Sequence, residues 1–264
     1  MSPTIQNACF STVGIDAVYV PLQVKRLALQ ASIQGLRALG VKGFNVTAPH
    51  KVKVIRYLDK VERSAAEIGS VNTVSNHDGK LCGYNTDGIG ARNALREAGV
   101  SPDGESILIF GAGGTSRAVA HVLASHASSI RLVNRTIAKA KELSLRLRKR
   151  YQLDIQYAPL STKLLRNYVE QASIIVNASS MGTNCRANPP IRREWLHADQ
   201  CVLDMVYRPF QTELLQVASQ VGATTVTGLD MLVNQGACSF ESWTGRKAPI
   251  PEMRHAIDQM RQET

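Results

Sequence analysis

The feature that most constrains the fold is a glycine-rich turn between an apolar strand and a helix. The strand is predicted over 107–110, and a helical pattern begins at Gly114. Such a junction presents backbone N–H groups at the positive end of the helix dipole, and glycine lets a pyrophosphate approach closely. The residues concerned are Gly111, Ala112, Gly113, Gly114, Thr115 and Ser116. Ser116 replaces the third glycine of the usual GxGxxG pattern but is small, so the segment predicts a dinucleotide site, with a plain tight turn as the alternative.

The next predicted strand, 130–133, leads to residues that select the nucleotide. Asn134, Arg135 and Thr136 follow it, and Lys139 comes shortly after. An NAD site usually has an acidic residue about 20 positions after the glycine turn, where it accepts a bond from the ribose 2′-hydroxyl. This segment offers donors and positive charge instead, which suit a 2′-phosphate. The sequence therefore predicts NADP as the cofactor, with a solvated surface arginine as the alternative for Arg135.

Strand and helix patterns alternate along most of the chain, which predicts an α/β fold with a parallel sheet covered on both faces. The predicted strands are 17–22, 43–46, 70–75, 81–84, 107–110, 130–133, 155–157, 174–177, 202–205 and 224–227. The predicted helices are 27–39, 88–98, one after Gly114, 137–151 and 163–172, and the pattern stays helical after Gly228. The first helix lies between two strands as in a βαβ unit, and residues 76–79 have the composition of a hairpin turn.

The order of these elements predicts two domains. A breaker segment at 99–104 precedes the strand of the glycine turn, and a junction fits near Asp87. The first predicted domain is an N-terminal α/β domain over 1–87, completed by helices within 231–264. The second, over 88–230, is a Rossmann-type domain with a doubly wound parallel sheet that binds NADP.

The composition of the 264 residues, with 44% hydrophobic and 20% charged residues, is typical of globular proteins. No run approaches the roughly 18 apolar residues of a membrane span, and the first residues lack the features of a signal peptide. We therefore predict a soluble, cytoplasmic protein without a membrane partner. The cysteines are scattered, with no CxxC pair and no histidine at metal-ligand spacing, so no metal site is expected. They are Cys9, Cys82, Cys185, Cys201 and Cys238, and we interpret them as small apolar side chains in a reducing compartment.

The formal net charge of +10 is compatible with two kinds of partner. A basic surface attracts nucleic acid, but an electropositive cleft equally concentrates an acidic small molecule. The densest basic run, 146–150, ends a predicted helix, where cations complement the helix dipole. Because no nucleic-acid recognition motif accompanies the charge, we predict a small-molecule substrate and no nucleic-acid partner.

Lys51 and Asp87 are the candidates for proton transfer. Each follows a predicted strand and stands at a strand-to-helix turn, which is where open α/β sheets place ligand-binding groups. Each also has a plain structural interpretation, since most lysines are solvated and Asp87 could cap the following helix. Lysine side chains titrate near pH 10.4, about three units above neutrality, so a lysine acts more readily as a proton donor than as a free base.

Six segments together, in this order, resemble the shikimate dehydrogenase family. They are 45–51 (NVTAPHK), 70–73 (SVNT), 84–88 (YNTDG), the glycine turn at 111–114, 134–136 (NRT) and 228–245 (GLDMLVNQGACSFESWTG). The resemblance spans nearly the whole chain. It implies a two-domain enzyme of aromatic amino acid and chorismate biosynthesis that reversibly reduces 3-dehydroshikimate to shikimate with NADPH. It leaves a homodimer open.

The resemblance also implies roles for individual residues. Lys51 and Asp87 match the family's catalytic pair. The residues that match substrate-binding positions are Ser2, Thr47, Asn72, Tyr207 and Gln235, of which Ser2 and Tyr207 would hold the carboxylate. Gly228 and Met231 match positions near the nicotinamide, and 177–182 resembles a loop beside the cofactor. Asp230 and Asn234 depart from the residues that the family often has there.

The start of the chain departs furthest from the family. The family begins with a further strand and a segment ending in Ser-x-Ser-Pro, whereas this chain has Met1, Ser2 and Pro3 in that place. The first strand and the first of two carboxylate-binding serines are therefore expected to be missing. One hypothesis is that an internal methionine was taken as the start, which predicts an in-frame apolar strand ending in serine just upstream. With a real truncation we expect weaker substrate binding and a looser first domain.

Three alternatives to an NADP-dependent shikimate dehydrogenase stay open at this point. One is a quinate/shikimate dehydrogenase that uses NAD, which the basic residues around Arg135 disfavour. Another is a truncated, inactive ligand-binding relative, to which the missing serine points. A nucleic-acid-binding protein is the weakest, because only the charge supports it.

Overall fold

The computed structural model describes residues 1–183 and 186–262. The chain forms two compact units. The first unit consists of Met1–Gly90 with Leu232–Thr264, and the second unit consists of Ala91–Met231. Two helices, α4 (Asp87–Glu97) and α9 (Gly228–Thr244), contain the points at which the chain passes from one unit to the other. Cys185, one of the cysteines interpreted above, lies outside the described residues.

The unit of Met1–Gly90 and Leu232–Thr264 contains a four-stranded sheet in the order β1-β3-β4-β2 over the described residues. Its strands are β1 (Gly43–Asn45), β2 (Lys60–Val61), β3 (Thr73–His77) and β4 (Lys80–Tyr84). The predicted hairpin is confirmed, because β3 and β4 pair antiparallel around Asp78 and Gly79, which both have positive φ. Asn76 Oδ1 accepts a hydrogen bond from Gly79 N and closes this turn.

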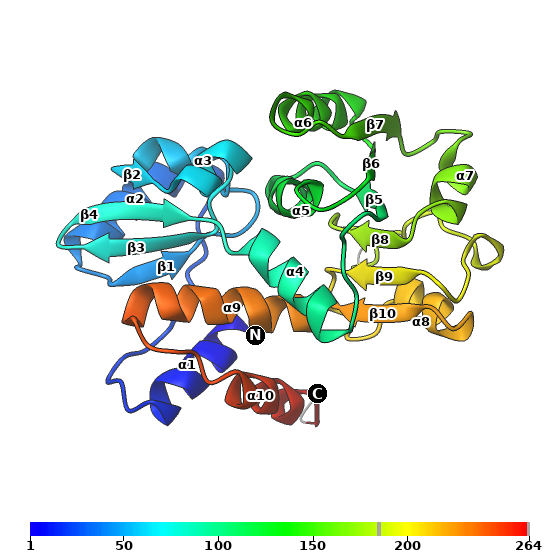
Figure 1. Ribbon diagram of the computed structural model, residues 1–264. Helices are drawn as coiled ribbons and strands as arrows, with labels where there is room; N and C mark the ends of the chain where they lie inside the picture. The colour runs from blue at the N-terminus through cyan, green and yellow to red at the C-terminus, as the bar shows by residue number, and fades with distance from the viewer. Residues whose placement is uncertain (184–185, 263–264) are drawn as a thin grey trace. The chain divides into compact units, whose positions relative to one another are not determined.

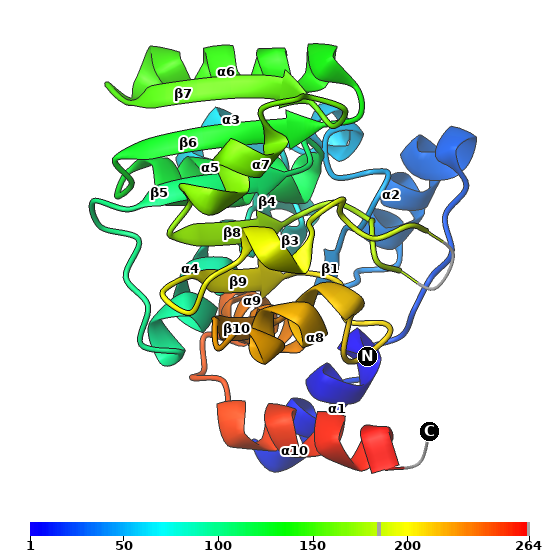
Figure 2. The same cartoon turned by 90° about the vertical axis from the view of Figure 1, so that its right-hand side faces the viewer.

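Further helices of this unit pack against the sheet or against one another. They are α1 (Ser2–Thr12), the 3-10 helix η1 (Arg26–Ala28), α2 (Leu29–Ala38), the 3-10 helix η2 (Lys53–Tyr57), α3 (Arg63–Ile68) and α10 (Ile250–Gln262). Leu29 and Ile33 of α2 pack on Val74 and Leu81 of the hairpin in one core cluster. Helices α1 and α10 lie side by side at the edge of the unit (Figures 1 and 2). The helix predicted over 27–39 is confirmed as η1 followed by α2.

The strand predicted over 17–22 is wrong, and with it the predicted βαβ unit. These residues have no regular secondary structure, and β1 pairs antiparallel with β3 instead. A strand needs a partner backbone, but here the Asn7 side chain occupies both backbone polar groups of Tyr19, at 2.6 Å from its N and 3.0 Å from its O. Val18, Val20 and Leu22 are 74%, 56% and 63% exposed, so the apolar pattern does not mark a buried strand.

The unit of Ala91–Met231 contains a parallel sheet whose order is β10-β9-β8-β5-β6-β7 in the part of the chain that the structure describes (Figure 2). Its strands are β5 (Ser106–Phe110), β6 (Ser129–Asn134), β7 (Asp154–Pro159), β8 (Ile174–Asn177), β9 (Cys201–Asp204) and β10 (Thr224–Thr227). The strand order turns back on either side of β5. Such a switch point is where open α/β sheets bind ligands, at the carboxyl ends of the strands.

Both faces of this sheet are covered, as predicted for a doubly wound fold. The helices are α5 (Gly114–Ala124), α6 (Ile137–Arg150), α7 (Leu165–Glu170) and α8 (Glu213–Gln220), with a 3-10 helix η3 (Arg193–Trp195). Ile107 and Ile109 of β5 pack in the cluster that contains α5 and α6, whereas Leu108 and Phe110 pack in the cluster of α7 and α8. Figure 1 shows these two pairs of helices on opposite sides of the sheet. None of the described helices is both long and apolar enough to cross a membrane.

Candidate active site

The glycine turn follows β5 and requires glycine for steric reasons at its first position. Gly111 has φ of +112°, and a Cβ there would lie 2.6 Å from Ser116 Oγ and 2.9 Å from the carbonyl oxygen of Ala178. By contrast, Gly113 has φ of −84°, and a Cβ on it would meet no atom within 4 Å. The exposed backbone of Gly113 therefore faces open space at the start of α5.

This turn fits a pyrophosphate. Gly113 is the N-cap of α5, and no side chain caps the helix there. The first-turn N–H groups of a helix have no partner within the helix, and they favour a negative charge together with the helix dipole. Ser116 Oγ donates to the carbonyl oxygen of Ala178 at 2.9 Å, which turns this side chain away from the helix end. The start of α5 therefore offers backbone N–H groups and the positive end of the helix dipole where a phosphate would bind.

The segment after β6 fits a 2′-phosphate. Arg135, Thr136 and Lys139 are exposed, and Asn134 Nδ2 donates to the carbonyl oxygen of Thr136 at 2.8 Å. Helix α6 begins here with no acidic residue in its first turn. The positive end of the helix and two cations therefore share one exposed edge of the sheet, a combination that attracts phosphate.

Lys51 and Asp87 form a largely buried ion pair in the first unit. Lys51 Nζ lies 2.5 Å from Asp87 Oδ2, and the two side chains are 14% and 3% exposed. Lys51 comes from the loop between β1 and η2, and Asp87 is the first residue of α4. The short contact between the two groups fixes the direction of the amine. The pair can therefore present an oriented proton donor.

Asn72 connects this pair to α9. Its Nδ2 donates to Asp87 Oδ1 at 2.8 Å and lies 3.2 Å from Gln235 Oε1, while its Oδ1 accepts from Thr86 N at 2.8 Å. The close approach of α4 and α9 depends on Gly90, because a Cβ there would lie 2.7 Å from Gln235 Cβ. Lys51, Asp87, Asn72 and Gln235, which are distant in sequence, thus form one polar cluster.

A second layer of hydroxyl groups supports the cluster and was not identified from the sequence. Thr73 Oγ1 donates to Asn72 Oδ1 at 2.9 Å and lies 2.8 Å from Ser239 Oγ. Asn45 Nδ2 donates to Ser239 Oγ at 3.1 Å. Ser239 lies one helical turn after Gln235, and this i, i+4 spacing is the signal that could have identified it.

The other residues expected to contact substrate are not part of this polar cluster as described, and they differ in exposure and in the unit to which they belong. Thr47 is exposed on the loop that carries Lys51. Ser2 is the first residue of α1 and is half-buried there. Tyr207 belongs to the second unit, where it follows β9 and is 40% exposed.

The residues expected near the nicotinamide lie at the start of α9. Gly228 is buried, and a Cβ on it would lie 2.6 Å from the carbonyl oxygen of Met205. Met231 is also buried, in the core cluster of α5 and α6. Asp230, one of the departures from the family, accepts hydrogen bonds from Thr227 N and Thr227 Oγ1, and so stabilises the start of this helix. Asn234 is buried one turn further along.

Burial disfavours the thiolate form of three cysteines, Cys9, Cys201 and Cys238. It raises the pKa of Cys201 to about 12, and burial together with the charge of Glu252 raises the pKa of Cys9 to about 12. Burial also raises the pKa of Cys238. Because the thiolate is the reactive form, these side chains behave as small apolar groups. Among the described residues, no group of three or more histidine, cysteine, aspartate or glutamate side chains is placed to hold a metal ion.

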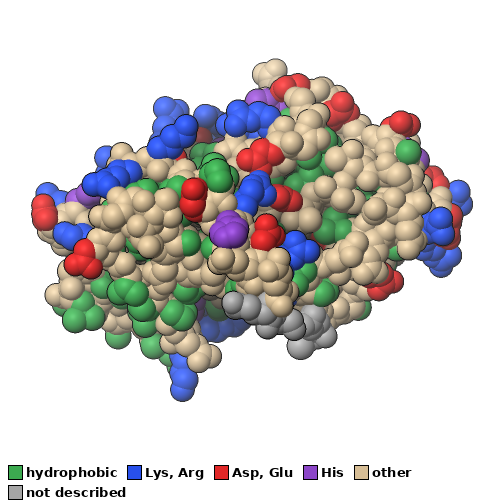
Figure 3. Space-filling view, turned by 90° about the horizontal axis from the view of Figure 1, so that it is seen from below, with side chains coloured by type: hydrophobic (Ala, Val, Ile, Leu, Met, Phe, Trp, Pro, Cys, Tyr) green, Lys and Arg blue, Asp and Glu red, His purple; other side chains and the backbone are tan. Residues whose placement is uncertain are grey.

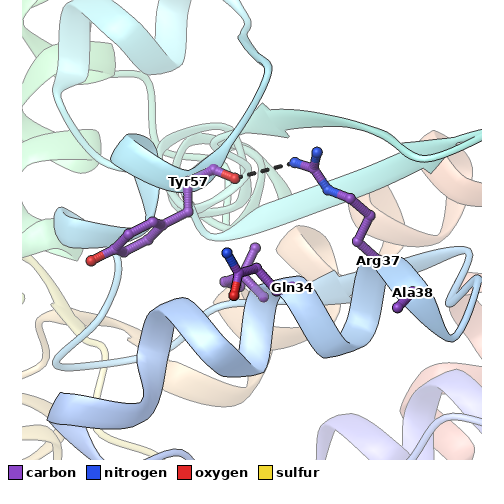
Figure 4. Close-up of a pocket in the computed structure, with 5 residues that line it drawn as sticks. Gln34, Arg37, Ala38 and Tyr57 are labelled. Atoms are coloured by element: carbon purple, nitrogen blue, oxygen red, sulfur yellow. Dashed lines mark hydrogen bonds between the residues drawn. The ribbon is translucent and has the colours of Figure 1, made fainter.

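A separate cavity of about 250 Å³ lies in the first unit between α2 and η2 (Figure 4). Its lining consists of Ile33, Gln34, Arg37, Ala38 and Tyr57. Arg37 donates to the carbonyl oxygen of Tyr57 at 3.5 Å and pairs with Asp59 at 2.9 Å. The cavity thus presents an apolar wall and an arginine that is already paired, and it lacks the acid–base pair that the Lys51 cluster provides.

The parallel sheet with its glycine turn and the buried lysine–carboxylate pair define a dinucleotide-dependent oxidoreductase. Three family models match the chain: the shikimate dehydrogenase substrate binding domain over residues 1–74, shikimate / quinate 5-dehydrogenase over 93–197, and the shikimate 5′-dehydrogenase C-terminal domain over 228–257. The chain belongs to the shikimate dehydrogenase family.

Individual relatives agree with this assignment. The shikimate dehydrogenase (NADP(+)) of Methanocaldococcus jannaschii is 42% identical over 262 residues, which cover 97% of this chain and 91% of that protein. A crystal structure of a shikimate dehydrogenase in complex with NADP+ has a TM-score of 0.90 at 41% identity, covering 98% of this chain and 90% of the other. The enzyme of Thermus thermophilus, solved with NADP(H) and shikimate, has a TM-score of 0.87 at 31% identity, covering 98% and 94%.

Proposed function

We propose that this chain catalyses the reversible, NADPH-dependent reduction of 3-dehydroshikimate to shikimate, a step in the biosynthesis of chorismate and the aromatic amino acids. The observation that carries the proposal is the Lys51–Asp87 pair, at 2.5 Å and joined through Asn72 to Gln235. It occurs in a chain whose relatives include shikimate dehydrogenases named for NADP(+).

The roles proposed for the catalytic pair are compatible with its geometry. Lys51 is the proton donor to the carbonyl oxygen of 3-dehydroshikimate in reduction, and it takes the proton back in oxidation. Asp87 orients the Lys51 amine and accepts a hydrogen bond from a substrate hydroxyl. The bound cofactor supplies or takes up the hydride. An ion pair that stays shielded from water stabilises the developing alkoxide more strongly than a solvated lysine would.

Substrate recognition relies on polar groups placed around this pair. Asn72, Gln235 and Thr47 are proposed to bond the ring hydroxyls, and Ser2 and Tyr207 the carboxylate. Asn72 and Gln235 are buried within the cluster, so a ligand that lacked the matching hydroxyl would not form the hydrogen bonds proposed for these amides. This arrangement favours a polyhydroxylated acid over a simple ketone.

Cofactor binding is proposed for the second unit together with the start of α9. Gly111, Ala112, Gly113, Gly114, Thr115 and Ser116 would hold the pyrophosphate, and Asn134, Arg135, Thr136 and Lys139 the 2′-phosphate. Gly228 and Met231 would flank the nicotinamide. We propose the same division of roles for the predicted domains: 1–87 with 231–264 bind the substrate, and 88–230 bind NADP. A cytoplasmic location and a homodimer stay predictions, and light scattering measures the second directly.

Crossed activity assays test the function. NADPH or NADH formation is measured with shikimate or quinate against NADP+ or NAD+, four combinations in all. We expect the highest kcat/KM with shikimate and NADP+. Preference for quinate with NAD+ would support the quinate/shikimate alternative, and no turnover with any combination would support the inactive relative.

A further inference from the structure

Asp204 lies at the carboxyl end of β9 and is fully buried, yet the proposed chemistry does not use it. Its Oδ1 accepts hydrogen bonds from Asn177 Nδ2 at 2.9 Å and Val206 N at 3.0 Å, and its Oδ2 accepts one from Thr212 Oγ1 at 2.7 Å. Burial raises the pKa of Asp204 above its usual range, and these hydrogen bonds act in the opposite direction. Burying a carboxyl group costs free energy, so we look for a function of Asp204 beyond packing.

The first of these bonds reaches the segment that lies against the glycine turn. Asn177 ends β8, and its Nδ2 also donates to the carbonyl oxygen of Met181 at 2.9 Å. Its Oδ1 accepts from Ser179 Oγ at 2.7 Å, so the side chain fixes segment 178–182 at both ends. The carbonyl oxygen of Ala178, within that segment, is the atom that a Cβ on Gly111 would approach to 2.9 Å.

The other two bonds hold the two ends of segment 205–211. Val206 N lies near its start, and Thr212, which caps α8, lies just after its end. Tyr207, which is proposed to hold the substrate carboxylate, belongs to this segment and is 40% exposed. The start of α9 packs closely on the same segment, because a Cβ on Gly228 would lie only 2.6 Å from the carbonyl oxygen of Met205. One carboxylate therefore connects the segments that flank both proposed ligands.

We propose that Asp204 is a positioning residue that holds segments 178–182 and 205–211 in register for NADP and substrate binding. The inference rests on the proposed function, because the assignments of the glycine turn and of Tyr207 come from it. A carboxylate suits this role since it accepts from three donors at once, whereas an apolar residue of the same size accepts from none.

Three variants test the hydrogen bonds of Asp204 separately. Asp204→Leu removes all three bonds, and we expect the Kd for NADP+ and the KM for shikimate each to rise by about tenfold or more. Thr212→Val removes the bond to Oδ2 and the side-chain cap of α8 but keeps both bonds to Oδ1, so the KM for shikimate should rise while the Kd for NADP+ stays within about twofold. Asp204→Asn keeps the oxygen that faces Asn177 and Val206, and the Thr212 hydroxyl can rotate to accept from the new amide. We expect this variant to restore near-parent values.

Gln200 supplies a matched control at the opposite end of β9. It is buried, and its Nε2 donates to the carbonyl oxygens of Val169 and Ala172 at 2.6 and 2.9 Å, while its Oε1 accepts from His197 N. Gln200→Leu should lower the stability of the unit without changing the NADP+ Kd or the shikimate KM. A purely structural role for Asp204 predicts the same behaviour for both leucine variants.

Hydrogen–deuterium exchange gives a readout that does not depend on catalysis. Asp204→Leu should speed exchange in both 178–182 and 205–211, Thr212→Val only in 205–211, and Gln200→Leu in neither. If Asp204→Leu does not fold, Thr212→Val carries the test. Unchanged exchange and unchanged ligand constants in the folded variants would overturn the proposal. Failure of the parent to oxidise shikimate would instead refute the proposed function, and the exchange data would still decide the role of Asp204.

Discussion

At the scale of single residues, Arg135 is the residue proposed to select NADP over NAD. It is exposed at the start of α6, beside Thr136 and near Lys139. Hydrogen bonds to a charged group contribute about 1.5–3 kcal/mol, so Arg135→Ala should weaken NADP+ binding by about tenfold or more. NAD+ lacks the 2′-phosphate, and its KM should stay nearly constant.

The control for Arg135 is Lys149→Ala, which removes the same charge from the exposed far end of α6. It should leave the KM values for both nucleotides nearly unchanged, because charges beyond a Debye length of about 8 Å are largely screened. Steady-state kinetics with each nucleotide measure the effect. Equal losses with NADP+ and NAD+ in Arg135→Ala would mean that Arg135 does not read the 2′-phosphate.

The sequence identified single residues of the candidate site better than it identified their connections. Lys51 and Asp87 stand at strand-to-helix turns, a local signal that can be read without a structure. Asp204 was not identified from the sequence and Ser239 has only its i, i+4 spacing from Gln235 as a local signal, because the importance of both residues lies in partners distant in sequence. Ser239 meets Thr73 across 166 positions, and Asp204 meets Asn177 across 27. The roles of the site residues stay predictions until variants are measured.

At the scale of elements, the β5–α5 junction makes a prediction that separates folding from binding. Gly111→Ala places a Cβ 2.6 Å from Ser116 Oγ at a φ of +112°, so we expect lower stability together with weaker NADP+ binding. Gly113→Ala meets no protein atom within 4 Å and needs no unusual φ. Its melting temperature should match the parent, while its NADP+ Kd should rise by about tenfold, because the methyl group takes the space of the pyrophosphate.

Calorimetric titration with NADP+ and thermal melts of the two variants provide the comparison. Arg117 N donates to the carbonyl oxygen of Gly113, so α5 begins at the same residue in either case. Parent-like NADP+ affinity in Gly113→Ala would show that the cofactor does not approach this backbone. Parent-like stability in Gly111→Ala would show that the turn tolerates a side chain.

The predicted strands are correct where the apolar segment has another strand to pair with. The strands of the parallel sheet and the 73–84 hairpin agree with the sequence because each buries an alternating or continuous apolar run. The segment 17–22 has the same kind of pattern but is not a strand, since pairing decides that outcome. Helices α1, α3 and α8 were missed, although Ile5 with Cys9 in α1 and Leu214 with Ala218 in α8 show the i, i+4 spacing of buried helix faces.

At the scale of the whole molecule, the net charge of +10 does not form a single basic field on the face drawn in Figure 3. Lys and Arg side chains there are interspersed with Asp and Glu side chains. Several basic residues are paired on the surface, as Arg166 is with Glu170 at 2.7 Å. Local positive charge at the start of α6 is therefore a better guide to the ligand than the total charge.

At this scale the proposed function involves both units, because Lys51 belongs to one and the glycine turn to the other. The most direct test of the account is NADPH formation from shikimate and NADP+ by Lys51→Ala, with Lys53→Ala on the exposed face of η2 as the control. We predict that the parent and Lys53→Ala turn over alike, and that kcat of Lys51→Ala falls by about 10²–10⁴-fold with an unchanged NADP+ Kd. A Lys51→Ala variant that keeps the parent kcat would contradict the account.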